Sequence, residues 1–211
     1  SIKYDVPVLG INMGNVGFMT EIEGDNAIHE LAYYLENKVR VEERSLLEVN
    51  FQKDNKNLSY KALNDIVLAR GSSVSMIETI TEIDGIHLAT YRGDGIVLST
   101  STGSTGYSLS SGGPIVTPSS KCLIVNPIAP HNINMRPLIV PDKTYFKISV
   151  NGRGKTHLLS LDSRIFTLEN GNDIYISKAK FNAITVQLDG TSFFDALREK
   201  LFWGQDSRNI Q

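Results

Sequence analysis

The chain has 211 residues, of which 41% are hydrophobic and 21% are charged, and its formal net charge is −2. This length and composition predict one large globular domain, or one domain plus a fragment, with a substantial core. The near-neutral charge gives no reason to expect a nucleic-acid partner, and no apolar run approaches the roughly 18 residues that span a bilayer. The single cysteine, Cys122, lies in an apolar run and is typical of a buried thiol in a reducing compartment, so we expect a cytoplasmic protein without a membrane partner.

The beginning of the chain reads as a strand followed by a helix. Residues 6–12 (VPVLGIN) form an apolar run of the kind that has neighbouring strands on both sides, so we expect further sequence upstream of residue 1. Asp25 is placed to cap a helix, because apolar residues recur after it at helical spacing. These residues are Ile28, Leu31, Ala32 and Leu35.

From residue 46 onward the pattern changes to short strands separated by Gly, Pro, Asn and Asp. Two hairpins are predicted, one around residues 54–57 and one around Asp84-Gly85. Further strand-like runs are CLIVNPI, PLIV, YFKISV, THLLSLD, IFTLENG, DIYIS and NAITVQL. A last helix is predicted over residues 193–202. The sequence therefore predicts a mainly β fold, an antiparallel β-sandwich-type domain with peripheral helices.

Residues 91–113 (YRGDGIVLSTSTGSTGYSLSSGG) are the most distinctive stretch. Residues 96–99 read as a strand, and the Ser, Thr and Gly residues that follow can start a helix with Ser104 or Thr105 as its N-cap. Exposed amides and small side chains would let the backbone approach an anionic ligand, and Tyr107 would lie against a flat ring. A plain Gly/Ser turn between two elements is the alternative.

Two smaller clusters also contain side chains that could bind a ligand. Asn64 and Asp65 put an amide beside a carboxylate, a pair suited to gripping a ribose or another diol, although an ordinary turn is the alternative. Arg92 and Asp94 bracket a glycine and read equally well as the exit of a hairpin. The four histidines and one cysteine show no zinc-ligand spacing, so no metal site is expected, and His131 reads as a structural hydrogen-bonding residue.

Four ordered segments resemble the NAD kinase family, the ATP- or polyphosphate-dependent kinases that phosphorylate NAD. They are GINMGNVGFM at 10–19, ALNDIVLAR at 62–70, residues 91–118, and PIAPHNINMRPLIV at 127–140. The third of these is the longest and most specific, and together the segments span most of the chain.

The resemblance implies roles for individual residues. Asn64 and Asp65 would bind the NAD ribose, and Arg92 with Asp94 would reach the nicotinamide half in a site completed across a subunit interface. The adenosine would be held by Thr105, Gly106, Tyr107, Ser108 and Ser110. Arg164 would touch the ligand, and Phe18 would line the same cleft.

The resemblance also implies an activity and an assembly. The family transfers the γ-phosphate of ATP, with Mg²⁺ or another divalent metal, to the 2′-hydroxyl of the NAD adenosine ribose to make NADP. Site residues shared between subunits imply a homodimer or homotetramer. Residues 1–12 would be the last strand of an N-terminal α/β domain, residues 13–192 the NAD-binding domain, and residues 193–211 a helix and tail that pack toward the N-terminal domain.

This sequence departs from the family pattern at several positions. Asp65 replaces the usual Glu, Gly106 the usual Ala, Ser101 the usual Pro and Ser163 the usual Gly. The family's Gly-Gly-Asp-Gly segment, whose Asp is taken as the catalytic base, is absent from the 211 residues, so no catalytic residue is expected in them and no kinase activity from them alone. A non-catalytic nucleotide-sensing or assembly domain, or a module of a related lipid kinase, are the alternatives.

Overall fold

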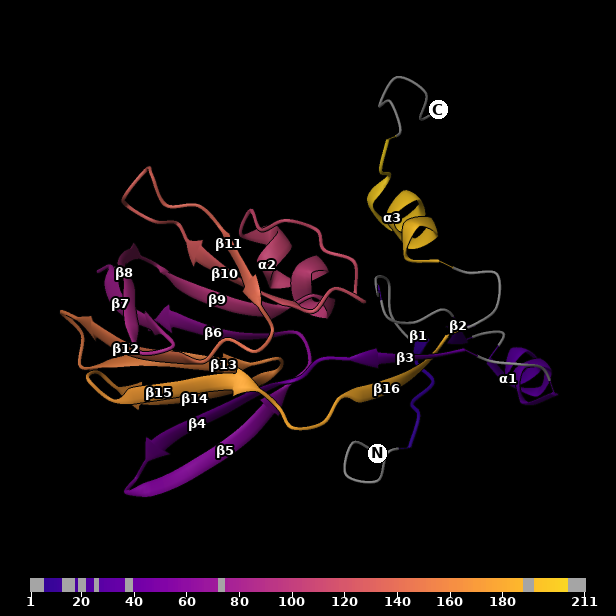
Figure 1. Cartoon of the computed structure of the whole chain (residues 1–211), viewed down its shortest axis with the longest axis horizontal. Coiled ribbons are helices and arrows are strands. Elements are labelled where there is room, and N and C mark those ends of the chain that lie inside the picture. The colour runs from indigo at the N-terminus through magenta and orange to yellow at the C-terminus, as the bar shows by residue number, and fades with distance from the viewer. Residues whose placement is uncertain are drawn as a thin grey trace. The chain divides into compact units, whose positions relative to one another are not determined.

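The computed structural model describes residues 6–12, 18, 22–24, 27–36, 40–71, 75–187 and 192–204. The chain divides into two compact units (Figure 1). The larger unit comprises residues 45–182, and the smaller unit combines residues 1–44 with residues 183–211.

The larger unit contains two six-stranded sheets in which every neighbouring pair of strands is antiparallel. The first, here called the β9 sheet, has the order β11 (Leu138–Pro141), β10 (Cys122–Ile128), β9 (Gly95–Thr100), β6 (Asp65–Arg70), β13 (Thr156–Leu161) and β14 (Arg164–Glu169). The second, the β12 sheet, has the order β5 (Lys56–Ala62), β4 (Leu47–Lys53), β15 (Asp173–Lys178), β12 (Phe146–Gly152), β7 (Ile77–Ile83) and β8 (Ile86–Gly93).

One hydrophobic core joins the inner faces of these two sheets. Side chains alternate along each strand, so that Phe146, Ile148 and Val150 of β12 all point to the same side. They belong to one buried cluster with Ile66 of β6 and Ile96 of β9, which lie in the other sheet. The observed architecture confirms the mainly antiparallel β-sandwich that the sequence predicts.

The central strand of the β9 sheet is buried on both faces. All six residues of β9 are buried. The face away from the core is covered by the 3₁₀ helix η3 (Thr102–Thr105) and the short helix α2 (Tyr107–Ser110), both of which contact β9. This explains why residues 96–99 read as a short, uniformly small or apolar run rather than as an alternating one.

Both predicted hairpins form. Strands β7 and β8 are connected by Asp84-Gly85, with φ of 50° and 80°, as a tight two-residue connection requires. Strands β4 and β5 pair from Leu47↔Ala62 to Lys53↔Lys56, so the connection is shorter than residues 54–57 and consists of Asp54 and Asn55.

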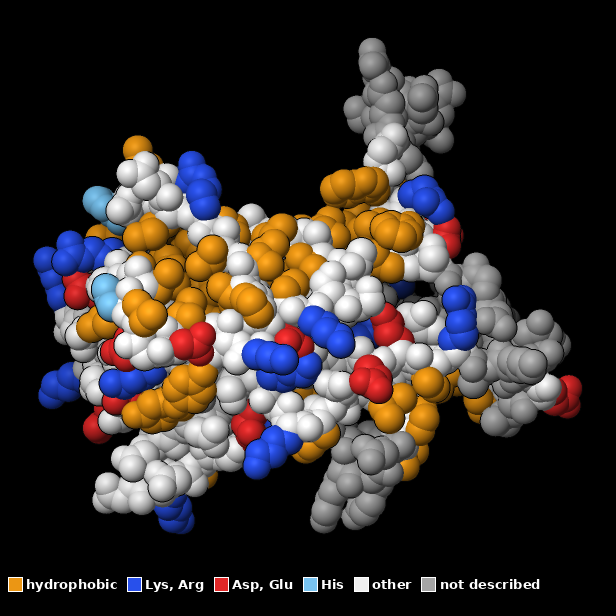
Figure 2. All heavy atoms as spheres, in the orientation of Figure 1, with side chains coloured by type: hydrophobic (Ala, Val, Ile, Leu, Met, Phe, Trp, Pro, Cys, Tyr) orange, Lys and Arg blue, Asp and Glu red, His pale blue; other side chains and the backbone are white. Residues whose placement is uncertain are grey.

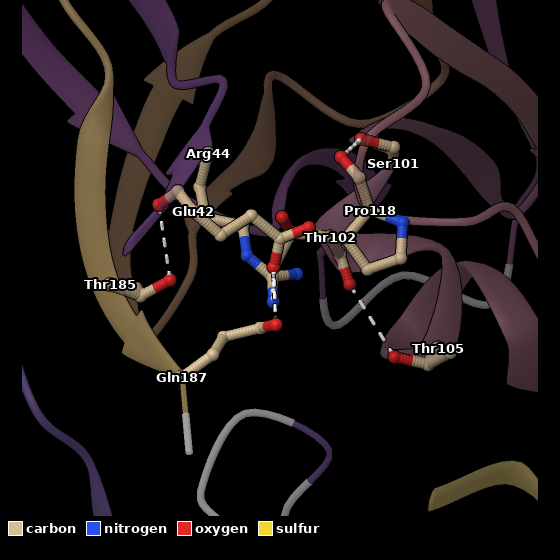
Figure 3. Close-up of polar contacts among 8 residues, drawn as sticks. All are labelled: Glu42, Arg44, Ser101, Thr102, Thr105, Pro118, Thr185 and Gln187. Carbon is tan, nitrogen blue, oxygen red and sulfur yellow. Dashed lines mark hydrogen bonds and ion pairs between the residues drawn. The ribbon is translucent and has the colours of Figure 1, made fainter. Parts of the chain in front are cut away.

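The smaller unit is built around strand β3 (Arg40–Arg44), which pairs with β16 (Ala183–Gln187). Figure 3 shows the polar contacts of Glu42, whose carboxylate lies 2.5 Å from Gln187 Nε2 and 2.5 Å from Arg44. The unit also contains β1 (Ile11–Asn12), β2 (Ile22–Glu23), α1 (Ala27–Glu36) and α3 (Phe193–Leu201). The last helix begins with a capping box in which Ser192 and Asp195 bond each other's backbone amides.

Two predictions for the beginning of the chain need correction. The buried strand expected over residues 6–12 is wrong, because only Ile11–Asn12 is a strand and Val6, Val8 and Ile11 are exposed. The predicted helix forms, but two residues of its apolar face, Ile28 and Leu31, are 88% and 38% exposed in the described part of the chain. The expected cap, Asp25, lies outside the described residues. The expected domain boundaries at residues 12 and 192 stay predictions.

Apolar side chains are also gathered on one face of the molecule. Figure 2 shows them over the area where Figure 1 places β10, β11 and α2. The large exposed apolar side chains of these elements are Leu138, Ile139 and Tyr107. Strand β11 is the edge of its sheet, so an apolar edge is left without a neighbouring strand in the described part of the chain.

Candidate functional site

The candidate site is built around residues 63–65, which we call the strap: Leu63 and Asn64 connect β5 to β6, and Asp65 is the first residue of β6. The three strap amides donate to one carboxylate, that of Asp162: the distances are 2.8 Å from Leu63, 2.9 Å from Asn64 and 3.2 Å from Asp65. The Asp162 amide in turn donates to the Asp65 carbonyl at 3.2 Å. Every backbone amide of the strap is therefore satisfied by a residue almost 100 positions away.

The carbonyl groups of the strap are satisfied from the other side. The Thr100 hydroxyl donates to the Leu63 carbonyl at 2.6 Å, and the Thr100 amide donates to the Asn64 carbonyl at 2.9 Å. The Ser99 hydroxyl adds a 3.3 Å bond to the same Asn64 carbonyl. Because the backbone is fully paired, the side chains of Asn64 and Asp65 are the groups that remain for a ligand.

The Asn64 and Asp65 side chains differ in their surroundings. In the part of the chain that the structure describes, the Asn64 side-chain amide makes no hydrogen bond, and the residue is partly exposed. Asp65 is only 7% exposed, and its carboxylate accepts a hydrogen bond from the backbone amide of Tyr107. Burial and the nearby negative charge of Asp162 raise the pKa of Asp65 to about 6, and the Tyr107 amide opposes that shift.

Residues 101–113, the small-residue turn, cover the strap at close range. A Cβ atom on Gly103 would lie 2.1 Å from the Asn64 carbonyl oxygen, so only glycine permits this backbone approach. A Cβ atom on Gly106 would lie 3.3 Å from the Gly103 oxygen and 3.6 Å from Asp65 Oδ2. Gly106 is therefore next to the candidate ligand-binding carboxylate, with space for little beyond a methyl group.

Side chains inside the small-residue turn hold its shape. Figure 3 shows the Ser101 hydroxyl donating to the Pro118 carbonyl, at 2.9 Å, and the Thr105 hydroxyl donating to the Thr102 carbonyl, at 3.4 Å. The Ser104 hydroxyl both donates to the carbonyl and accepts from the amide of Val116, each at 3.1 Å.

The predicted N-cap is therefore wrong. Helix α2 begins after Gly106 and has no side-chain cap, because Ser104 is used by Val116 and Thr105 by the preceding turn. The helix is only four residues long. A long helix dipole aimed at a ligand is accordingly not a feature of this site.

The remaining predicted adenosine residues separate into exposed and buried ones. Tyr107 is 46% exposed and Ser110 is exposed, so both side chains are available to a ligand. Ser108 is fully buried, and its carbonyl accepts hydrogen bonds from Asn126 Nδ2 at 2.9 Å and from the Gly113 amide at 2.8 Å. Ser108 therefore stabilises the conformation of the small-residue turn, and its buried side chain is not available to a ligand.

Arg164 lies beside the strap's anchor in sequence, two residues after Asp162 at the start of β14. Its guanidinium carbon is 5.9 Å from the centre of the Tyr60 ring, and the residue is exposed. The aromatic contact gives an exposed arginine a preferred position, and its nitrogen atoms make no hydrogen bond or ion pair to any described residue, so they are available to a ligand.

Arg92 and Asp94 lie at the other end of β9. The strand runs from Gly95 to Thr100, about 17–20 Å of extended chain, so Asp94 is separated from the strap by the length of the strand. Asp94 Oδ1 is 2.7 Å from Arg70, and Arg92 is 2.8 Å from Glu78. Within this one chain the structure does not bring these two residues to the strap.

Phe18 belongs to the smaller unit, where its ring centre lies 6.5 Å from that of Phe193. Its expected place in the ligand cleft stays a prediction. Among the residues that the structure describes, no group of three or more His, Cys, Asp or Glu side chains is arranged to hold a metal ion. In the same part of the chain, no helix is long and apolar enough to cross a membrane.

The fold and the site define a class of protein, a two-sheet antiparallel β domain with a candidate small-molecule site. In that site the strap backbone is fully hydrogen-bonded, and the side-chain amide of Asn64 and the carboxylate of Asp65 lie beside the small-residue turn. Comparison of the sequence with models of known protein families agrees with this class and identifies the family. The model of the ATP-NAD kinase C-terminal domain matches residues 63–188, and that of the ATP-NAD kinase N-terminal domain matches residues 2–39. The chain belongs to the NAD kinase family.

Individual relatives cover nearly the whole chain. It is 46% identical to an NAD kinase of Christiangramia forsetii over 99% of this chain and 73% of the relative, and 37% identical to one of Bacteroides fragilis over 96% of this chain and 70% of the relative. The crystal structure of yeast NADH kinase complexed with NADH superposes with a TM-score of 0.88 at 28% identity, covering 97% of this chain and 61% of the yeast chain. An Archaeoglobus fulgidus NAD kinase in complex with ATP gives 0.76 at 28% identity, covering 93% of this chain and 74% of that one.

Sequence reasoning found the strap and the small-residue turn but missed the role of Asp162. The carboxylate acts on residues 97–99 positions earlier in the chain. A strand ending in Asp carries no local signal for such a contact. The pairing of β13 with β6 creates it.

Proposed function

We propose that this chain is the NAD-binding part of an NAD kinase, which transfers the γ-phosphate of ATP to the 2′-hydroxyl of the NAD adenosine ribose. The observation that carries the proposal is the strap: its backbone is paired throughout, and it presents a buried carboxylate beside Tyr107 and an Asn64 side-chain amide that makes no hydrogen bond to any described residue. Relatives named NAD kinase, and a yeast relative crystallised with NADH, support a dinucleotide as the ligand.

In this proposal the strap binds the ribose. An ionised Asp65 accepts hydrogen bonds from hydroxyl groups, and the Asn64 amide both donates and accepts. Tyr107 lies against the adenine ring, Thr105 and Ser110 contribute hydroxyls, and Gly106 lets the backbone approach. Arg164 adds a cation at the edge of the site. Asp65 is one methylene shorter than the family's Glu, so the carboxylate approaches from closer to the sheet.

A second subunit completes the nicotinamide half. Arg92 and Asp94 are too far along β9 to reach the strap of their own chain, which supports a homodimer or homotetramer in which these residues serve a neighbouring site. The apolar edge formed by Leu138 and Ile139 of β11 gives such an assembly a surface to bury. The oligomeric state and a cytoplasmic location stay predictions.

The donor in this proposal is magnesium-bound ATP, a substrate that brings its own metal. The described residues do not fit a resident metal ion, because they contain no suitable cluster of ligands. Phosphoryl transfer consists mainly of positioning and charge stabilisation, together with a base that orients the accepting hydroxyl. The 211 residues contain no Gly-Gly-Asp-Gly segment. We therefore expect the 211-residue chain to bind NAD or NADP weakly and to form no NADP.

The binding claim is tested by calorimetric titration of NAD and NADP into the purified protein. Asn64→Ala should reduce affinity by about 1–3 kcal/mol, because ligand hydroxyls lose a partner in a partly buried site. Asn57→Ala, in the β5 hairpin, is the matched control and should bind as the wild type does. Equal NAD affinity of the Asn64 variant and wild type would mean that the strap is an ordinary turn that does not bind the ligand.

The catalytic claim has its own assay. Incubation of the 211-residue chain with NAD, ATP and magnesium should give no NADP, since a missing general base alone typically costs about 10²–10⁴ in rate. NADP formation above a no-protein blank would show that a catalytic base lies within these residues. Dinucleotide binding without turnover by any longer form of the protein would instead favour a nucleotide-sensing domain.

A further inference from the structure

Asp162 has an arrangement that ligand binding by itself does not require. Its Oδ1 atom accepts from the amides of Asn64 and Asp65, and its Oδ2 atom accepts from that of Leu63. Bonds from amides to a carboxylate are stronger than those between neutral groups. One side chain thus fixes three consecutive amides of the strap.

The position of Asp162 is itself fixed by the sheet. The residue follows the last residue of β13, whose Leu161 pairs with Ile66 of β6. Its φ of 50° is in the left-handed region, which turns the chain into β14, and its amide returns a bond to the Asp65 carbonyl. The carboxylate is therefore held by backbone pairing on the same strand, β6, that Asp65 begins.

The other side of the strap restricts its movement further. The hydroxyl of Thr100 bonds the Leu63 carbonyl and also accepts from the Gly103 amide at 3.1 Å. The strap is enclosed between Asp162 on its amide side and the β9 end on its carbonyl side. Loss of Asp162 would release the amides while the carbonyls stay held, which allows the strap to rotate rather than detach.

We propose that Asp162 is a positioning residue for the dinucleotide site: by fixing the strap amides, it sets the directions in which the Asn64 and Asp65 side chains meet the ligand. This inference rests on the proposed function, in which those two side chains bind the ribose. Asp162 acts through the strap. Its negative charge also contributes to the raised pKa of Asp65, so removing that charge should lower the pKa of Asp65.

The chain offers a matched control for this residue. Asp84 has the same φ of 50°, also lies in a hairpin, and its Oδ1 atom accepts from the Tyr145 amide at 2.9 Å while its own amide donates to the Tyr145 carbonyl at 2.9 Å. It belongs to a connection of the β12 sheet rather than to the strap. Asp84→Ala therefore removes a side-chain-to-amide bond of the same kind, one bond where Asp162→Ala removes three, without touching the proposed site.

The test compares Asp162→Ala, Asp162→Asn and Asp84→Ala with wild type, by thermal unfolding and by calorimetric titration of NADP at a temperature where all are folded. Asp162→Ala should weaken NADP binding at least tenfold, and Asp84→Ala less than twofold, even where both lose similar stability. Asp162→Asn keeps the oxygen that serves Asn64 and Asp65, so it should recover part of the affinity; it also serves as the test variant if the alanine variant does not fold.

Two results would overturn the inference while leaving the proposed function intact: wild-type affinity in both Asp162 variants, or an equal loss of affinity in Asp84→Ala. If wild type itself binds no NADP, the proposed function fails. The hold of Asp162 on the strap, on which the inference depends, is tested without any ligand by hydrogen exchange: the amides of residues 63–65 should exchange at least tenfold faster in Asp162→Ala than in Asp84→Ala. Equal exchange rates would contradict it.

Discussion

The polar side chains near the two ends of strand β9 differ in whether they already have hydrogen-bonding or ion-pair partners. At the Thr100 end, the strap has a fully paired backbone and side chains that keep free hydrogen-bonding capacity. At the Gly95 end, the charged side chains are paired with one another, Asp94 with Arg70 and Arg92 with Glu78. The Thr100 end therefore combines a fixed backbone with side chains that are available to a ligand. At the Gly95 end, the charged side chains form ion pairs within the chain.

This difference indicates which half of a dinucleotide site is ready in the single chain. The strap needs no rearrangement to offer an amide and a carboxylate, so a ligand gains those bonds without an ordering cost. The pairs at the Gly95 end are one-third or more exposed, and such pairs contribute about 0–1 kcal/mol. A partner or ligand can exchange them at little cost.

The largest effect is expected at the contact between the small-residue turn and the strap. Gly103→Ala puts a carbon 2.1 Å from the Asn64 carbonyl oxygen, so the backbone must move, and we expect a loss of about 3 kcal/mol of unfolding free energy. Chemical denaturation measures it. Gly71→Ala, whose added carbon would be 3.9 Å from the nearest atom, is the control and should change stability by less than about 1 kcal/mol. Equal stability of Gly103→Ala and Gly71→Ala would mean that the small-residue turn does not pack closely against the strap.

A substitution at Gly106 should act on binding rather than on folding. Gly106→Ala adds one carbon 3.3 Å from the Gly103 oxygen and should be tolerated, whereas Gly106→Val extends toward Asp65 Oδ2 and should weaken NADP binding by about 2 kcal/mol. Calorimetric titration of both variants separates the two outcomes. If the valine variant binds as the alanine variant does, the ligand does not approach this turn.

The Asp65 carboxylate predicts opposite pH dependences for stability and for binding. Because its pKa is raised to about 6 in the folded state, the stability it contributes is complete below the unfolded pKa of about 4 and is lost as pH rises through 6. Binding of hydroxyl groups needs the ionised form, so NADP affinity should rise over the same range. Asp65→Asn should remove both slopes. Parallel slopes in wild type, or slopes that persist in the variant, would contradict this role.

The smallest effect is expected at the Gly95 end. Asp94→Asn should change the unfolding free energy by no more than about 1 kcal/mol, because it disrupts one exposed ion pair. It should also leave NADP binding to an isolated chain unchanged, and it should weaken binding only where chains assemble. Analytical ultracentrifugation combined with titration distinguishes these cases. Weaker binding by a variant that stays monomeric would place Asp94 in its own chain's site.

The sequence predicted the fold better than it predicted the site. Strand runs and turn residues are local signals, so CLIVNPI became β10 and Asp84-Gly85 became a hairpin turn. The N-cap prediction failed because Ser104 finds its partner in Val116, twelve residues on. Asp162 and the burial of Asp65 depend on strand pairing between distant segments, which composition and spacing do not reveal.

The most direct test of the account is an NADP titration of the isotope-labelled protein followed residue by residue by NMR. We predict saturable shifts of the Asn64, Asp65 and Tyr107 amides, with clearly smaller shifts at Arg92 and Asp94 while the protein is monomeric. Binding that moves only the Arg92–Asp94 end, or the absence of saturable binding, would contradict the claim that the strap is the dinucleotide site.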